Sequence, residues 1–82
     1  MFEQQLINLK KVIEQNEDII TEIDSQTIVE TNKFKEDLGL DSMAMMSLSY
    51  ELQELLPQLD DSAFSTWVIV SDCLKDMEQA NA

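Results

Sequence analysis

Apolar side chains recur at helical spacing near both ends of the chain. In residues 2–16 they lie four, three and four positions apart, at Phe2, Leu6, Leu9 and Ile13. Residues 70–79 carry a second series, at Val70, Cys73, Leu74 and Met77. Because about 3.6 residues make one helical turn, each series lies along one side of a helix. The pattern predicts a first helix over residues 2–16 and a last helix that runs to about residue 79.

Residues 42–56 predict another helix, and this one has two apolar faces. At about 100° per residue, one face collects the side chains expected in the core, which are Met45, Leu48, Leu52, Leu55 and Leu56. Met43, Met46 and Tyr50 fall on roughly the opposite face, together with Ser47 and Glu54. Methionine adapts to varied surfaces and tyrosine makes amphipathic contacts, so this second face suits docking of partner proteins. The alternative is that a loop folds over it and buries it.

The segments between these helices show no clean period. Residues 17–41 predict a long connection whose apolar side chains lie against the helices, with a brief helical turn over residues 24–27. Pro57 should end the middle helix, and residues 60–65 predict a short helix. We expect residues 67–70 to form a buried segment that leads into the last helix. Because strand signals are nearly absent, we expect one all-α domain over residues 1–82, a small bundle of three main helices and one short helix.

The charge balance narrows the range of partners. The 82 residues include 17 acidic and 5 basic side chains, for a net charge of −12. Such a chain is a poor ligand for nucleic acid or for an anionic membrane surface. It favours encounters with basic patches on other proteins, although the acidic side chains could also serve only solubility.

Cysteine content and hydropathy indicate the cellular compartment in which the protein resides. A single cysteine, Cys73, rules out an internal disulfide. The N-terminal residues lack the basic-then-apolar pattern of a secretory signal, and no apolar run reaches the length of a membrane span. We therefore expect a cytoplasmic protein.

Ser42 is the most informative polar residue. It follows the single glycine of the chain, Gly39, and the carboxylate of Asp41 can cap the helix that begins there. The start of a helix carries partial positive charge and unpaired N–H groups, which suit a bound or attached phosphate. The chain contains no histidine, and the lysine nearest to Ser42 in sequence is Lys35. We therefore interpret Ser42 as a residue that an external enzyme modifies, not as a nucleophile of its own reaction.

Other candidate chemistry has weaker support. Cys73 and Trp67 fit positions in the core better than a reactive thiol or a binding platform. Asp60 and Asp61 fit solvated capping near a helix start, and no pattern matches a metal site. The sequence predicts no enzyme activity.

The segment from Phe34 to Met43 resembles the prosthetic-group attachment site of acyl carrier proteins, where a Phe precedes an Asp-Leu-Gly-x-Asp-Ser-Leu motif. The resemblance extends over the whole chain in length, acidity and order of helices. It implies that a phosphopantetheinyl transferase attaches 4′-phosphopantetheine to Ser42, with Asp41 and Gly39 shaping the site. It further implies a monomeric carrier that presents acyl thioesters to loading and synthase enzymes, in polyketide or fatty acid-type biosynthesis.

Several positions depart from the family pattern. Met43 replaces a Leu, and Ala44 and Ser47 stand where carriers of fatty acid synthesis usually have acidic residues. Docking would then depend on Met43, Met46, Tyr50 and Glu54, which favours a carrier of a polyketide or mixed pathway. Two alternatives stay open. One is an aminoacyl carrier of a peptide synthetase, although such carriers commonly have a second Gly and a His near the serine, where this chain has Leu40 and Asp41. The other is an acidic helical adaptor that is never modified.

Overall fold

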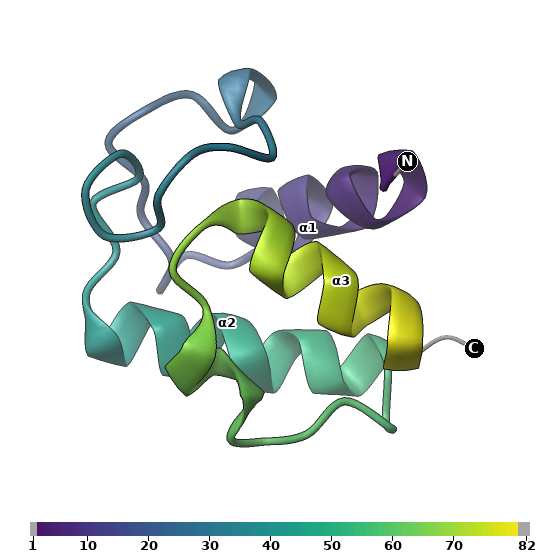
Figure 1. Ribbon diagram of the computed structural model, residues 1–82. Helices are drawn as coiled ribbons and strands as arrows, with labels where there is room; N and C mark the ends of the chain where they lie inside the picture. The colour runs from purple at the N-terminus through teal and green to yellow at the C-terminus, as the bar shows by residue number, and fades with distance from the viewer. Residues whose placement is uncertain (1, 81–82) are drawn as a thin grey trace.

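The computed structural model describes residues 2–80 of the chain. It contains three α-helices, α1 (Glu3–Gln15), α2 (Ser42–Leu55) and α3 (Val70–Ala80), and two short 3₁₀ helices, η1 (Ser25–Thr27) and η2 (Ala63–Thr66) (Figure 1). Across residues 2–80 there is no strand, and the only sheet-like pairing is an isolated antiparallel bridge between Lys33 and Ile69. The all-helical class predicted from the sequence is confirmed. A fourth α-helix is not, because residues 60–65 contain part of η2 and no α-helix.

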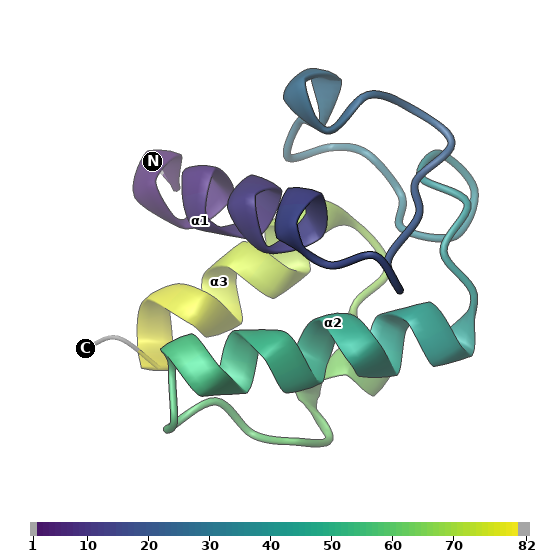
Figure 2. The same cartoon turned by 180° about the vertical axis from the view of Figure 1, so that it is seen from behind.

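The long connection and η2 flank the beginning of α2. Figures 1 and 2 show α2 along one edge of the molecule, with its first turn below the long connection at one end. Helix α1 packs against α2 and α3, and η2 packs against the same two helices. The start of α2 therefore meets both the connection that leads into it and η2, which follows α2 in the sequence.

The predicted inward faces of the helices form the core. The buried apolar residues of the helices are Leu9, Val12, Ile13, Met45, Leu48, Leu52, Val70, Cys73, Leu74 and Met77. Phe2 and Leu6 pack against this core while staying partly exposed. Burial of these apolar side chains is the main force that holds the three helices together.

Two sequence-based expectations about the core are wrong. Leu55, the last residue of α2, is exposed, whereas Leu56 is half-buried and packs against the core. Val68 is also exposed, whereas its neighbour Trp67 is buried. The Trp67 backbone is extended, and an extended backbone points successive side chains to opposite sides.

The long connection lies against the helices, as its apolar residues predict. Its buried side chains are Ile19, Ile28, Phe34, Leu38 and Leu40. Backbone hydrogen bonds hold the second half of the connection beside the start of α3. The N–H of Val70 donates to the carbonyl of Asn32 (2.8 Å), and the N–H of Phe34 donates to the carbonyl of Val68 (3.1 Å). Ile20 and Val29 stay exposed, so the contact is partial.

The helical turn expected at residues 24–27 is present as η1. Asp24 caps it by accepting a hydrogen bond from the N–H of Gln26 (3.0 Å). The side chains of Ser25 and Gln26 donate to the Glu14 carboxylate at the end of α1. These hydrogen bonds lower the pKa of Glu14, because they favour its charged form. The turn thereby ties the connection to α1.

Gly39 has a left-handed backbone, with φ of +75°. It lies beside the point where the N–H of Glu22 donates to the carbonyl of Leu38 (2.8 Å). A Cβ at position 39 would lie 2.5 Å from Cγ of Glu22. The tight approach expected at Gly39 is thus present, with a backbone conformation that suits glycine.

Gly39→Ala should lower the free energy of unfolding by about 1–2 kcal/mol, because a left-handed backbone strains residues with a Cβ. Gly39→Asn should lose less, since asparagine tolerates this region better. Urea denaturation of the three proteins measures the difference. Equal losses for Ala and Asn would show that crowding by Glu22, not backbone strain, explains the glycine.

Candidate functional site at the start of helix α2

Asp41 determines where α2 begins. Its backbone is extended (φ −89°, ψ −177°), and its carboxylate oxygen Oδ1 accepts a hydrogen bond from the N–H of Ala44 (2.8 Å). Its carbonyl accepts the first helical hydrogen bond, from Met45 (2.9 Å). Ser42 is therefore the first residue of the helix, and it is exposed. Both features agree with what the sequence predicts for Asp41 and Ser42.

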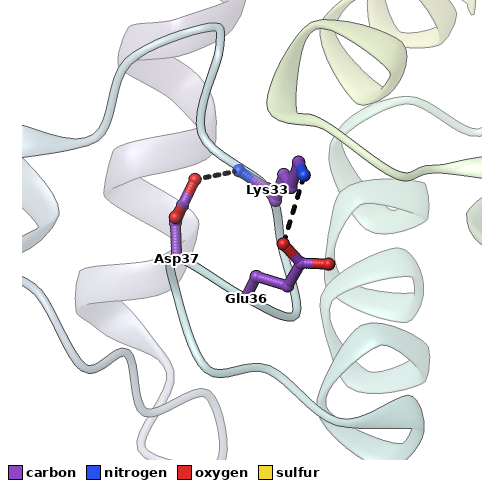
Figure 3. A network of polar contacts seen from close by, with 3 residues as sticks. All are labelled: Lys33, Glu36 and Asp37. Carbon is purple, nitrogen blue, oxygen red and sulfur yellow. Dashed lines mark hydrogen bonds and ion pairs between the residues drawn. The ribbon is translucent and has the colours of Figure 1, made fainter.

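A tight turn before α2 positions this capping residue. In Figure 3 the carboxylate of Asp37 reaches back to the N–H of Lys33 (2.7 Å), and Glu36 reaches the Lys33 ammonium (3.1 Å). The N–H groups of Asp37 and Leu38 both donate to the carbonyl of Lys33. Because Leu38 is fully buried, the turn is anchored from inside as well as by hydrogen bonds.

A cavity of about 360 Å³ opens beside Ser42. Three separate parts of the chain line it: the turn before α2, the first turn of α2, and the segment around η2. The lining residues are Lys33, Lys35, Glu36, Ser42, Met45, Phe64, Ser65, Trp67 and Val68. Its volume falls within the usual range of small-molecule sites, about 300–1,000 Å³. Sequence reasoning missed this cavity, because no local pattern pairs residues 33–36 with residues 64–68.

Trp67 forms a fixed part of the cavity wall. It is buried, its indole N–H donates to the carboxylate of Asp76 (2.7 Å), and its ring stacks near that of Phe34 with centroids 6.2 Å apart. The interpretation of Trp67 as a core residue is confirmed. Trp67 nevertheless lines the cavity that contains Ser42.

The second apolar face of α2 is open to solvent. Met43, Met46 and Tyr50 are 77%, 57% and 67% exposed, and Glu54 is exposed beside them. Ser47 is half-buried. The long connection therefore does not bury this face, and the alternative that it does is wrong. Whether partner proteins dock on this face stays a prediction.

Ser49 is a feature that sequence reasoning missed. It is 3% exposed, and its hydroxyl has no hydrogen-bond partner within the described residues. It follows Met45 by one helical turn, on the same side of α2. The sequence signal for Ser49 is a small polar residue between the core residues Leu48 and Leu52. The larger apolar residues around it dominate the pattern, so its burial is easily missed.

The remaining candidate groups lie away from this site. Cys73 is buried in the core, and burial raises the pKa of its thiol well above the usual value, with a smaller contribution from Asp76 and Asp72. Asp60 is exposed and accepts two hydrogen bonds from Ser62, which lower the pKa of Asp60.

Two further searches concern metal ligands and membrane spans. Within residues 2–80, no three His, Cys, Asp or Glu side chains come together in a way that could hold a metal ion. None of the helices in this range has the length and apolarity needed to cross a membrane.

Comparison with known proteins adds no assignment. No protein-family model matches the chain, and neither a curated protein nor a solved structure is significantly similar to it. The function must therefore be inferred from the residues of this chain alone.

Asp41→Ala should lower the free energy of unfolding by about 1 kcal/mol, because it removes the acceptor for the N–H of Ala44. Asp41→Asn keeps an oxygen at that place and should retain most of the stability. Asp61→Ala, at an exposed aspartate, serves as the control and should change stability by less than about 0.5 kcal/mol. Chemical denaturation gives all three values, and an Ala loss no greater than the control would refute the capping role.

Proposed function

We propose that the chain is an acyl carrier protein that bears 4′-phosphopantetheine on Ser42. The observation that carries the proposal is the exposed Ser42 hydroxyl at the first residue of α2, beside a preformed cavity. The segment from Phe34 to Met43, which resembles a carrier attachment site, forms the turn that presents it.

The residues around Ser42 fit the prosthetic group. A phosphodiester at this position lies at the positive end of the α2 dipole, which stabilises negative charge. The cavity beside Ser42 has room for part of a flexible arm and has both basic and apolar lining. When bound, the group supplies a terminal thiol that holds acyl groups as thioesters.

An external phosphopantetheinyl transferase must activate Ser42, because the chain has no histidine to act as a base. With coenzyme A as donor, the Ser42 oxygen forms a bond to the phosphorus next to pantetheine, and the pyrophosphate bond of coenzyme A breaks. The leaving group is adenosine 3′,5′-bisphosphate, and the transferase takes the hydroxyl proton. Asp41, which caps α2, and Gly39, in the turn before it, position Ser42 at the start of the helix. In this proposal the carrier is not itself an enzyme.

The cavity lining favours acyl cargo over aminoacyl cargo. Phe64, Trp67 and Val68 give it an apolar wall that shelters a hydrocarbon chain from water. We therefore keep the aminoacyl carrier only as an alternative.

The exposed Met43, Met46 and Tyr50, with Glu54 beside them, are proposed to contact the transferase and the synthase enzymes. Adaptable apolar side chains surrounded by negative charge suit a partner surface that combines an apolar patch with basic residues. The same face would serve the alternative, an unmodified adaptor. Modification of Ser42 distinguishes the two.

The test is co-expression with a broad-specificity phosphopantetheinyl transferase, followed by intact-mass measurement. The mass should increase by one phosphopantetheinyl group. The folded, modified protein should also gain one thiol that reacts rapidly with a disulfide reagent, because Cys73 is buried and its thiol stays protonated.

Ser42→Ala is the matched control. It should keep the stability of the wild type within about 0.5 kcal/mol, since Ser42 is exposed, and it should show neither the mass increase nor the new thiol. An unchanged mass of the wild-type chain would favour the adaptor.

A further inference from the structure

Within residues 2–80, Ser49 is a polar residue buried among apolar ones. It is 3% exposed, and its hydroxyl makes no hydrogen bond. A serine inside a helix can satisfy its hydroxyl on the carbonyl one turn earlier, which here belongs to Met45, but this bond is not formed. Because a buried hydroxyl without a partner costs free energy, it requires an explanation, and a ligand that binds there is one.

The Ser49 hydroxyl lies on the side of α2 that leads to the cavity. Ser42, Met45 and Ser49 stand at positions i, i+3 and i+7 of the helix, so they share one stripe. Ser42 and Met45 line the cavity, and Ser49 follows by one further turn. At 1.5 Å per residue, Ser49 lies about 10 Å along the helix from Ser42.

The segment that follows α2 covers this stripe. Figures 1 and 2 show that the chain turns back after α2 and runs along the helix to η2. The side-chain amide of Gln53 donates to the carbonyl of Leu59 (3.0 Å), and farther along the segment Phe64 and Ser65 line the cavity. Along α2, Ser49 lies between Gln53 and the cavity. The cavity therefore opens at one end of the interface that buries Ser49.

We propose that Ser49 is a specificity residue for the cargo of the carrier, and that its hydroxyl donates a hydrogen bond to a 3-oxo group of the acyl chain. This inference rests on the proposed function and names the class of cargo. The arm on Ser42 is flexible, so the acyl chain at its end can fold back into the cavity. There the chain meets Met45 first, whose adaptable side chain makes room, and Ser49 one turn beyond.

The proposal predicts that the effect of removing the hydroxyl changes sign with cargo. In the unmodified protein the hydroxyl is buried without a partner, so its removal should not destabilise the fold. With a 3-oxoacyl chain bound, the same substitution leaves a buried carbonyl unpaired and should be destabilising. A residue that only packs would give the same effect in both states.

The experiment compares wild type, Ser49→Ala and the control Ser47→Ala in four forms. These forms are the unmodified protein and the protein with the arm alone, with an octanoyl arm and with a 3-oxooctanoyl arm. The transferase makes the last three from coenzyme A and its two thioesters, and intact mass verifies each. Ser47 lies on the same helix and is only half-buried, so its replacement gives a comparable gain in helix propensity without removing a buried hydroxyl.

The measured quantity is the Tm of Ser49→Ala relative to that of Ser47→Ala. It should be equal or higher in the unmodified protein, and about 4–8 °C lower in the 3-oxooctanoyl form. The arm alone should cause no loss, and the octanoyl form should lose less than the 3-oxooctanoyl form. A ¹³C label at the 3-oxo carbon should give an upfield shift in Ser49→Ala, because the hydrogen bond is lost.

The contrary outcomes separate this site from the carrier function. A lower Tm of unmodified Ser49→Ala than of Ser47→Ala would mean that the hydroxyl already has a partner, which refutes the site. Equal losses with octanoyl and 3-oxooctanoyl, a loss with the arm alone, or no loss in any form would also refute it, while the carrier function stands. If wild type accepts no arm, the proposed function fails and this inference fails with it.

Discussion

The capping hydrogen bond from the N–H of Ala44 to the carboxylate of Asp41 is the contact on which the site depends. It sets the first residue of α2 at Ser42 and so places a hydroxyl at the positive end of a helix. The turn before it is held by Asp37 and by the left-handed Gly39. These contacts are local, and they place Ser42 at the exposed start of the helix.

The same helix separates two surfaces. Its inner face enters the core through Met45, Leu48 and Leu52, while Met46 and Tyr50 on the outer face stay in solvent. Ser42 lies between them and lines a cavity to which Trp67 also contributes. A partner that grips the outer face is therefore brought close to Ser42, whereas an attached group can turn toward the cavity. We infer that one short helix serves both docking and attachment.

Local patterns predicted much of this arrangement. The periodic residues 2–16 and 70–79 form helices, and Asp41 caps α2, because spacing and capping act within a few residues. Leu55 and Val68 were misplaced, since their exposure depends on where the backbone leaves a regular conformation. The cavity could not be predicted, because it forms only when Phe34 stacks near Trp67 and brings the turn with Lys33 and Lys35 beside η2. Such contacts between distant segments leave no periodic signal in a single sequence.

The central claim is that Ser42 is accessible in the native fold, at the edge of a preformed cavity. The most direct measurement compares the amide and indole NMR spectra of the protein before and after attachment of phosphopantetheine. Shifts should be confined to the first turn of α2, to Lys35 and Val68, and to the indole N–H of Trp67. Shifts that extend to the core at Leu9 and Cys73 would contradict the account, because they would mean that the fold rearranges to accommodate the group and that the cavity is not preformed.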